Sequence, residues 1–492
     1  MIVLKFGGTS VEDAAALERL GAIVRNRLPE RPVLVVSALA GITDRLVELS
    51  ALALHRQTEF CERSLQALRR RHLETLAALA GGPPPPAEQA AIEGLCDELT
   101  QLLSGVAAVG ELTPRTRDAV LSFGERLSPS LVRFALERGG LPAVETDARR
   151  IIVTDERFNQ ARPLPAETQR RAEEQLRPLL SAGAVPVLGG FIGATQNGIG
   201  TTLGRGGSDF SASLLGAALD AERVEIWTDV DGMLTADPRV CPAARRIPRI
   251  SFVEAAESAY YGAKVLHPAS LLPAMQKNIP VWVLNSRRWL PGPPDPRRTG
   301  TLITARPLAR RDGPPSPRHG TVACISSKRR IAVIDIVSTR MLLAHGFMKA
   351  IFDVFAAHQC PIDMISTSEV SVSVTVSEVE KVPAIADDLG RFADVRYEGR
   401  KAILCLVGEA MRNTPGVAAA VFAALDGINV RMISQGASEV NIGFVIEDDD
   451  VPLAVERLHR QFFGADPTAE QEGDGLAQTA SGERAIQGGD GR

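Results

Sequence analysis

Short apolar runs alternate with amphipathic helical patterns through the first 305 residues. The runs predicted to be strands cover residues 1–6, 33–36, 184–192 (a strand and its turn), 224–227, 281–285 and 300–303. Helical patterns cover residues 11–28, 45–80, 87–105 and 210–218, and another helix opens at 122–125. Strands that alternate with helices are typical of α/β domains with a parallel sheet. The pattern predicts such a domain, with a helical insertion that Gly and Pro residues split at 81–86.

The rest of the chain contains nearly the same unit twice. The first copy reads as strand 330–337, helix 347–358, strands 362–366 and 370–376, helix 378–390 and strand 395–400. The second copy reads as strand 403–407, helix 417–425, strands 430–434 and 442–446, and helix 452–463, without a fourth strand. An extra strand at 321–326 precedes the first copy. We expect it to cross over and complete the second unit, so that the two copies interlock.

Composition indicates where the domains end. Residues 305–318 are rich in Pro and Arg, as linkers often are. We predict a first domain at 1–305, a linker at 306–320 and a second region at 321–464. The units of that region are expected at about 328–400 and about 401–464, the latter with strand 321–326. Residues 465–492, rich in Gly, Gln and Asp, are expected to be disordered.

Charge and cysteine content narrow the classes of function. The chain has 492 residues and a formal net charge of −4 without a block of like charge, which argues against nucleic acid or a membrane surface as a partner. No apolar run reaches the ~18 residues of a membrane span, and no signal-peptide pattern is present. The six cysteines show no CxxC spacing, which disfavours a disulfide framework or a zinc site. A reducing cytoplasm is the expected location.

The segment 202–209, Thr-Leu-Gly-Arg-Gly-Gly-Ser-Asp, is predicted to bind an anion. Gly204, Gly206 and Gly207 allow the backbone to approach a bulky anion and to point N–H groups at it. The helix that follows places these glycines at a helix N-terminus, where the dipole favours phosphate. Arg205 adds a planar fork of donors suited to a carboxylate or a phosphate.

A second glycine turn lies at the start of the chain. Lys5 ends the first predicted strand, Gly7 and Gly8 follow it, and a helical pattern comes next. Strand, glycine turn and helix make a phosphate cradle, although the Walker and G-x-G-x-x-G patterns are absent. There the Lys5 ammonium group could meet a transferring phosphoryl group. Asp209, which ends the first anion segment, is either a functional group or only the N-cap of its helix.

Six motifs in order resemble those of the aspartokinases, which have the amino-acid kinase fold. They are Lys-Phe-Gly-Gly-Thr-Ser at 5–10, Ser-Ala-Leu-Ala-Gly-Ile-Thr at 37–43, Ser-Phe-Gly-Glu at 122–125, the anion segment, Ile-Trp-Thr-Asp-Val-Asp-Gly at 226–232 and Gly-Ala-Lys-Val-Leu-His-Pro at 262–268. The resemblance covers nearly all of residues 1–464. It implies a three-layer α/β/α sandwich followed by two interlocked ferredoxin-like ACT domains.

The resemblance also implies roles for single residues toward the substrate, L-aspartate. Arg205 would hold its α-carboxylate, Glu125 its ammonium group, and Thr43 would help to orient it. Ser37 and Ser208 would complete the substrate site. From the residues alone, Glu125 could equally be a solvated helix residue.

Lys5 and Asp209 are expected to be the catalytic residues, and ATP with Mg²⁺ the cofactors. The resemblance implies a nucleotide site made by Lys5, Gly7, Gly8, Ser10, Gly206, Gly207, Thr228, Asp229, Arg239 and Lys264. Leu234 departs from the family, which usually carries an aromatic residue there. No set of metal-ligating residues is predicted. The implied reaction is phosphorylation of the β-carboxylate of L-aspartate to 4-phospho-L-aspartate, the first step toward lysine, threonine and methionine.

The C-terminal units suggest regulation by an amino acid. Residues 367–372, Thr-Ser-Glu-Val-Ser-Val, resemble the lysine-sensitive aspartokinases and imply L-lysine as the effector. Gly346 opens a helix whose N–H groups could receive an α-carboxylate, while Asp363 and Glu369 could pair with the ammonium groups of a diamino acid. Ala344 departs from the lysine-sensitive pattern, which carries a hydroxyl residue there. The remaining residues expected at the effector site are Met341, Phe347 and Ser368.

Several readings stay open at this point. Another amino-acid kinase with a different acceptor would share the fold, and a non-catalytic amino-acid sensor would need only the C-terminal half. The C-terminal units could also serve dimerisation without a ligand. Because exposed sheet edges are usually paired or covered, we expect a homodimer through residues 323–464, with a tetramer when effector is bound. A following homoserine dehydrogenase domain is not expected, because too few residues follow the last unit.

Overall fold

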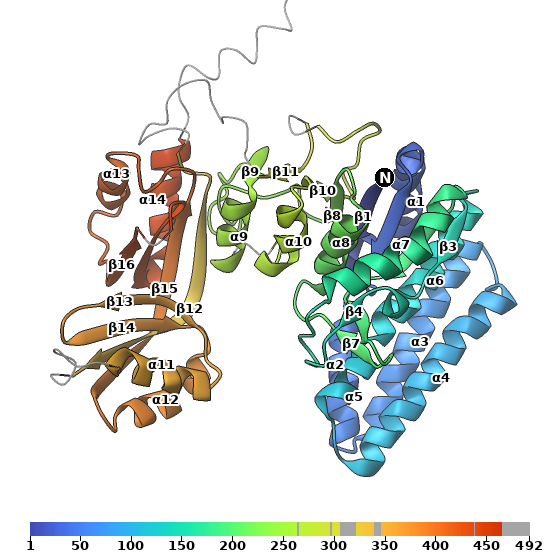
Figure 1. Ribbon diagram of the computed structural model, residues 1–492, viewed down its shortest axis with the longest axis horizontal. Coiled ribbons are helices and arrows are strands. Elements are labelled where there is room, and N and C mark those ends of the chain that lie inside the picture. Colours follow the sequence, from blue (N-terminus) through green and yellow to red (C-terminus); the bar gives the residue numbers. More distant parts are fainter. Residues whose placement is uncertain (263–264, 296–297, 306–320, 339–345, 437, 465–492) are drawn as a thin grey trace, which may run out of the picture.

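The computed structural model describes residues 1–262, 265–295, 298–305, 321–338, 346–436 and 438–464. An α/β part formed by residues 1–305 lies beside a smaller part formed by residues 321–464 (Figure 1). The predicted linker at 306–320, the predicted tail at 465–492, and Lys264, Met341 and Ala344 lie outside the described residues. Within the described ranges, no helix combines the length and the apolar character needed to cross a membrane.

An eight-stranded sheet forms the centre of the first part, in the order β3-β5-β2-β1-β8-β10-β11-β9. Its strands are β1 (Ile2–Phe6), β2 (Pro32–Val36), β3 (Ala143–Glu145), β5 (Val185–Gly189), β8 (Val224–Thr228), β9 (Arg249–Ser251), β10 (Val281–Asn285) and β11 (Thr301–Thr304). The six strands from β3 to β10 in this order are parallel, and β11 runs antiparallel to β10. The carboxyl ends of the central strands therefore meet at one edge, where open α/β sheets bind their ligands.

Helices cover both faces of this sheet. One face packs against α1 (Ala14–Arg27) and α6 (Phe123–Arg138), and the other packs against α7 (Pro165–Ser181), α8 (Gly207–Ala218) and α10 (Leu272–Gln276). Strand β1 shows how the sequence sorts its side chains: Leu4 and Phe6 belong to the first apolar core and Val3 to the second. The result is the three-layer α/β/α sandwich implied by the resemblance, which is thereby confirmed.

A helical insertion extends from one end of the sandwich (Figure 1). It contains α2 (Ile42–Leu54), α3 (Thr58–Ala80), α4 (Pro86–Val109) and α5 (Pro114–Leu121). The prediction of one helical stretch at 45–80 was wrong in its interior, because the chain breaks at Arg56, whose φ is 55°. Within α3, the Arg71 guanidinium donates to the Ala40 carbonyl at 2.7 Å. Arg71 thus supports the 37–43 loop and is not part of a purely solvated face.

A small three-stranded sheet leads into the anion segment. It consists of β4 (Val153–Thr154), β6 (Ile192–Thr195) and β7 (Gly200–Thr202), in the order β4-β6-β7. The apolar run at 184–192 was predicted as a strand and a turn, and this is confirmed: β5 ends at Gly189 and Phe191 takes a φ of 63°. This turn sends the chain into the second sheet, and β7 ends at the first residue of the anion segment.

The C-terminal part contains a six-stranded sheet in the order β13-β14-β12-β15-β17-β16. Its strands are β12 (Cys324–Val337), β13 (Ile362–Thr367), β14 (Ser371–Val376), β15 (Asp394–Val407), β16 (Met432–Gln435) and β17 (Asn441–Glu447). Its helices are α11 (Phe347–Ala357), α12 (Val382–Leu389), α13 (Val417–Ala424) and α14 (Val451–Phe463).

Two long strands serve both units of this part. The beginning of β12, at 324–328, pairs with β15 at 403–407, whereas 331–337 pair with β14 and with 394–401 of β15. Strands predicted as separate elements at 321–326 and 330–337 are therefore one strand with a register shift between them. The predicted crossover is confirmed, because the residues before the first unit complete the sheet of the second.

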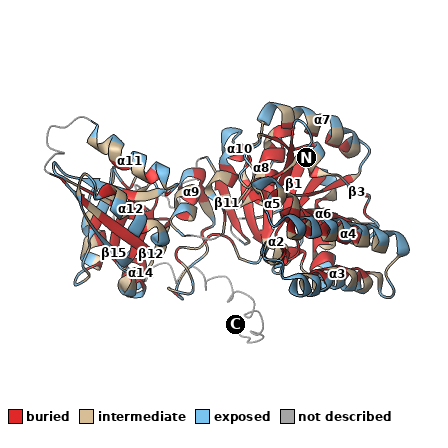
Figure 2. Ribbon diagram, turned by 90° about the horizontal axis from the view of Figure 1, so that it is seen from below, coloured by how far each residue is buried: buried red, intermediate tan, exposed pale blue. Residues whose placement is uncertain are grey.

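Helix α9 (Phe252–Tyr260) lies between the two parts (Figure 2). Its Ser258 hydroxyl is 3.0 Å from the Ser326 hydroxyl on β12, and the Asn441 amide on β17 donates to Glu257 at 2.8 Å. A further bond joins the Thr235 hydroxyl to the His459 ring at 2.9 Å. These contacts connect the α/β part to the C-terminal sheet.

Candidate active site

A cleft of about 660 Å³ opens at the carboxyl edge of the central sheet. It brings together most of the residues predicted for substrate and phosphate. Those that line it are Lys5, Gly8, Ser37, Thr43, Glu125, Arg205, Gly206, Gly207, Ser208 and Asp209. They come from the ends of β1 and β2 and from the starts of α2, α6 and α8, which are distant in sequence. Sheet topology alone therefore assembles the site.

Lys5 and Asp209 form an ion pair at the centre of the cleft, with Nζ and Oδ1 2.6 Å apart. Lys5 points to the α8 side of the sheet because residues of β1 alternate between its faces. Asp209 lies in the first turn of α8, which begins at Gly207, so the simple N-cap interpretation is wrong. Both residues are buried, with side-chain exposures of 10% for Lys5 and 12% for Asp209. A buried pair at a helix N-terminus beside a glycine turn suits the handling of a charged group.

The N-terminus of α8 is open to the cleft. Gly206 is the N-cap with a φ of 70°, and no side chain caps the helix. A Cβ atom on Gly206 would come within 2.4 Å of the His267 side chain, so only glycine fits here. On the other wall, a Cβ atom on Gly8 would come within 3.0 Å of the Ala38 carbonyl. The two glycines let the β1 and α8 turns approach the same space.

Three residues expected to contact the nucleotide phosphates are already engaged. The Gly7 N–H donates to the Trp227 carbonyl at 2.9 Å, and the Gly207 N–H donates to Gly204 at 3.0 Å. The Ser10 hydroxyl is buried and donates to the Trp227 carbonyl at 3.3 Å. These groups are bonded within the chain, and the expectation that they bind phosphate stays a prediction. Gly8 and Gly206 remain available for that role.

Glu125 is a fully buried carboxyl group on the wall of the cleft. One oxygen accepts a hydrogen bond from the Ala38 N–H at 3.2 Å, and the other is buried without a hydrogen-bond partner within the described residues. Burial raises the pKa of Glu125 to about 8, although the Ala38 bond and the Lys5 charge act in the opposite direction. The interpretation of Glu125 as a solvated helix residue is thus wrong. An unpartnered buried oxygen beside a cleft is suited to an incoming cation.

Arg205 also lines the cleft, where it is exposed, and its guanidinium forms no ion pair within the described part of the chain. His267 stands beside it, and its pKa is lowered by burial and by the Arg205 charge. Thr43 lies in the first turn of α2, and Ser208 lies in the first turn of α8. The cleft therefore offers a cation on one side and a titratable acid on the other, as an α-amino acid would require.

The residues expected at the nucleotide base and ribose lie outside this cleft. Thr228 ends β8, and its hydroxyl donates to Asp229 at 3.2 Å. Arg239 is highly exposed and is paired with Asp237 at 2.6 Å. These side chains are near the carboxyl edge, but the structure does not join them to the cleft that holds Lys5.

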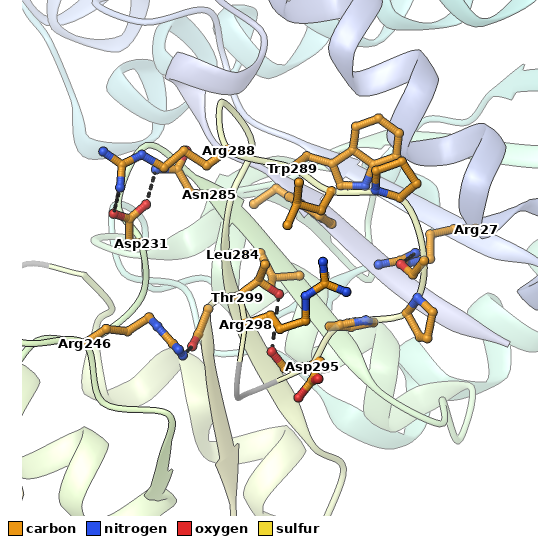
Figure 3. A pocket seen from close by; sticks show the side chains of 17 residues that line it. Arg27, Asp231, Arg246, Leu284, Asn285, Arg288, Trp289, Asp295, Arg298 and Thr299 are labelled. Atoms are coloured by element: carbon orange, nitrogen blue, oxygen red, sulfur yellow. Dashed lines mark hydrogen bonds and ion pairs between the residues drawn. The ribbon is translucent and has the colours of Figure 1, made fainter. Parts of the chain in front are cut away.

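A second cavity, of about 380 Å³, lies beneath the 284–300 segment (Figure 3). Asp231 on its rim accepts a hydrogen bond from the Asn285 amide at 2.7 Å and also pairs with Arg288. Arg27, at the far end of the cavity, is buried and bonded to Glu225 at 3.0 Å. The two cavities share no lining residue. The second cavity therefore does not extend the Lys5 cleft.

The predicted effector residues do not form one cluster. Gly346 has a φ of 87° and caps α11, where Phe347 stacks edge-on against Phe392. Asp363 lies near the start of β13 and Glu369 in the turn after it, so about 20 Å of extended strand separates them. A single chain does not bring the two carboxylates together, and their contact with one diamino acid stays a prediction.

Asp363 is also not free. Its side chain is 2% exposed and pairs with the Lys328 ammonium at 2.6 Å. The Tyr260 hydroxyl, on α9, donates to the same carboxylate at 3.2 Å, and the Ser377 hydroxyl donates to its other oxygen. Ser368 closes the β13–β14 turn through the Ser371 hydroxyl at 2.7 Å.

Six cleft residues were missed by the sequence analysis: Asp44, Arg117, Leu121, Asn159, Gln160 and Phe191. Asn159 and Gln160 belong to a loop without a motif, and nothing in the local pattern distinguishes them. Phe191 follows a Gly-Gly pair, and its positive φ is a signal that only the structure provides.

Comparison with known proteins gives two family matches. Residues 1–285 match the amino acid kinase family, and residues 334–387 and 404–462 match the ACT domain. Lysine-sensitive aspartokinase 3 of Escherichia coli is 38% identical over 94% of this chain and 99% of its own length. Aspartokinase 2, chloroplastic, of Arabidopsis thaliana is 35% identical over 94% of this chain and 85% of its own length.

Solved structures agree with these matches. Escherichia coli aspartokinase III in complex with aspartate and ADP superposes with a TM-score of 0.80 at 36% identity, covering 94% of this chain and 100% of that one. The same enzyme in complex with lysine and aspartate gives a TM-score of 0.76 at 37% identity, with 94% and 99% covered. The resemblance drawn from six motifs is confirmed, and the chain belongs to the aspartokinases of the amino acid kinase family.

Proposed function

We propose that this chain is an aspartate kinase, which transfers the γ-phosphoryl group of ATP to the β-carboxylate of L-aspartate. The observation that carries the proposal is the 2.6 Å Lys5–Asp209 ion pair, which shares one cleft with Arg205 and Glu125. The Escherichia coli relative that was solved with aspartate and ADP supports both the acceptor and the nucleotide.

The two ends of the cleft suit the two charges of an α-amino acid. Arg205 presents a planar donor fork, which can bind a carboxylate through two parallel hydrogen bonds. Glu125 presents a buried oxygen without a hydrogen-bond partner among the described residues, which can accept from an ammonium group. An acceptor held at both points would have its side-chain carboxylate free to approach Lys5.

The chemistry requires positioning and charge neutralisation more than acid–base catalysis. A β-carboxylate is ionised near neutral pH, with an ordinary pKa of about 4, so no base is needed to activate it. Lys5 would neutralise the charge on the transferring phosphoryl group, and Asp209 would hold the Lys5 ammonium in place. The N–H groups of Gly8 and Gly206 would receive phosphate oxygens from the two turns.

Mg²⁺ would enter with the nucleotide. The described residues contain no cluster of three or more His, Cys, Asp or Glu side chains that could hold a metal ion. Mg²⁺ commonly keeps several waters and binds through substrate phosphates and one or two carboxylates. We therefore assign it to the ATP complex, where it would neutralise phosphate charge, and assign no residue of this chain as a dedicated ligand.

L-Lysine is the proposed effector, supported by the lysine-sensitive relative and by the relative solved with lysine. Because Asp363 and Glu369 lie at opposite ends of β13, an effector that touches both would need one of them from a second copy of the chain. This requirement fits the expected homodimer through residues 323–464.

The test is ADP release with purified chain, ATP and Mg²⁺, using L-aspartate, L-glutamate or N-acetyl-L-glutamate as acceptor. We expect release only with L-aspartate. Lys5→Ala should lower kcat by about 100- to 1000-fold with a smaller effect on the KM for aspartate, because the charge that Lys5 stabilises develops during transfer. Release with another acceptor alone, or a Lys5→Ala variant as active as wild type, would refute the assignment.

A further inference from the structure

Asp118 on α5 is a buried carboxylate that none of the motifs includes. It is 1% exposed and receives hydrogen bonds from two segments. The Asn159 N–H donates to both of its oxygens, at 3.0 and 2.9 Å. Thr202 donates its hydroxyl to one oxygen at 2.6 Å and its N–H to the other at 3.0 Å. One side chain thus holds the 155–161 loop and the end of β7 together.

The two segments form one wall of the active-site cleft. Asn159 and Thr202 both line the cleft, and the Ala161 N–H donates to the Thr202 carbonyl at 3.0 Å. Gly204, with a φ of 78°, packs so closely on this loop that a Cβ atom there would come within 3.2 Å of the Asn159 carbonyl. Arg205 follows directly. Any displacement of the Asn159 loop would therefore move the backbone that carries the Arg205 guanidinium.

The backbone of Asn159 has an uncommon conformation, which its hydrogen bonds to Asp118 hold in place. Its φ of 70° is uncommon for a residue other than glycine. Its side-chain oxygen is buried without a hydrogen-bond partner among the described residues, so the side chain does not supply the missing support. The backbone bond to Asp118 fixes this residue. Burial raises the pKa of Asp118, and the hydrogen bonds from Thr202 and Asn159 act in the opposite direction.

We propose that Asp118 is a positioning residue for the amino-acid substrate. By joining Thr202 to Asn159, it holds the wall so that Arg205 can receive the α-carboxylate. This inference rests on the proposed aspartate kinase activity. Asp118 touches neither substrate nor phosphate in this scheme, so its loss should affect the binding of aspartate more than the binding of ATP or the transfer step.

The decisive variant is Asp118→Asn, which keeps the shape and replaces one acceptor by an NH₂ group facing N–H and O–H donors. The KM for aspartate should rise about 10- to 100-fold, as expected when a buried donor loses its partner. The kcat and the KM for ATP should change less than the KM for aspartate, because Asp118 bonds to Asn159 and Thr202 and not to Lys5, Asp209 or the Gly8 turn. Equal losses in kcat and in both KM values would show a general structural role and would overturn the proposal.

Two further variants guard against misfolding. Thr202→Val removes the hydroxyl bond to Asp118 and should raise the KM for aspartate, whereas Thr202→Ser keeps that bond and should raise the KM less. If Thr202→Val left the KM for aspartate at the wild-type value, the positioning role of Asp118 would be refuted even if Asp118→Asn failed to fold.

Glu225→Gln is the matched control, because Glu225 is also a fully buried carboxylate but bonds to Arg27, which lines the second cavity and not the cleft. It should lower the thermal midpoint without raising the KM for aspartate; a rise equal to that of Asp118→Asn would overturn the proposal. The activity of the wild-type chain with aspartate separates the proposed kinase function from the positioning role of Asp118. If wild type phosphorylates aspartate but Asp118→Asn has an unchanged KM, only the positioning role fails.

Discussion

The buried carboxyl group of Glu125 makes the binding of aspartate depend on pH. In the free protein its pKa is about 8, so the group is mostly neutral at pH 7. An ammonium group binds to the ionised form, and ionising Glu125 at pH 7 costs about 1.4 kcal/mol, the equivalent of one pKa unit. With that pKa, the ionised fraction rises about eightfold between pH 7 and pH 8.5. The KM for aspartate should fall by a similar factor over this range.

Initial rates of ADP release at saturating ATP, measured from pH 6.5 to 8.5, give this profile directly. Glu125→Gln supplies the control, since the amide cannot ionise. Its KM for aspartate should be higher than that of wild type and should not change with pH. A KM for wild type that stays flat from pH 7 to 8.5 would refute the reasoning, as would a Glu125→Gln variant that retains the wild-type slope.

The same group makes a prediction about stability. Because burial raises the folded pKa of Glu125 to about 8, above the ordinary value of 4.5, the folded protein holds a proton that the unfolded chain releases. The contribution of this group to stability is fully present below about pH 4.5 and is lost as pH rises through about 8. Glu125→Gln should therefore unfold at a higher temperature than wild type at pH 8, and this advantage should shrink toward pH 5. An advantage that grew at low pH would contradict the sign.

Three other changes test the binding, regulatory and assembly assignments. Arg205→Ala should raise the KM for aspartate about 100-fold with a smaller loss of kcat, because it removes a charge-assisted pair present in ground and transition states; a loss in kcat alone would contradict this. Tyr260→Phe should leave calorimetric binding of L-lysine intact but weaken inhibition, because it removes a bond from α9 to Asp363; unchanged inhibition would refute the coupling. Deleting residues 321–492 should give a monomeric or insoluble α/β part, whereas a soluble dimer in sedimentation would place the interface elsewhere.

Local pattern and motif were sufficient to predict most of the fold. The alternation of apolar runs with helices predicted the layers of the first part, and the unpaired strand before the first C-terminal unit predicted the crossover. Two kinds of structural detail were not predicted from the sequence. Strands separated by a register shift, such as the two halves of β12, look like separate elements in sequence. A helix break at Arg56 depends on a positive φ that its residue type does not indicate.

The site could be predicted only where glycine and charge occur together in a short stretch. Lys5 and Asp209 were identified in this way, and the structure places them in contact. Which N–H groups remain free cannot be seen in sequence: Gly7 and Gly207 have the right residue type, but other parts of the chain take their hydrogen bonds. Asp118 was not identified, because a single carboxylate in a helical pattern is ordinarily exposed, whereas this one is buried.

The attachment of the two C-terminal units to the α/β part differs, and this difference indicates how an effector could act. Ala323, Cys324, Cys405 and Val407, which belong to the sheet of the second unit, pack into the same apolar core as β8 and β10. The helix-side core of the first unit contains only its own residues, whereas Ile331, Val333 and Met364 share a second apolar cluster with the second unit, against which Tyr261 packs. Near the predicted effector segment, the first unit reaches α9 through the polar Tyr260–Asp363 contact.

Apolar cores resist sliding because they are close-packed, whereas one exposed hydrogen bond contributes only about 1 kcal/mol. The two units share β12, β15 and an apolar cluster and should therefore move together, whereas the polar Tyr260–Asp363 contact is the part of their attachment to α9 that can change at small cost. The Lys328 ammonium group already pairs with Asp363. The ammonium group of a ligand would therefore have to compete with Lys328 for this carboxylate. A change at this contact would reach Tyr260, which ends α9 and lies just before the 262–268 motif.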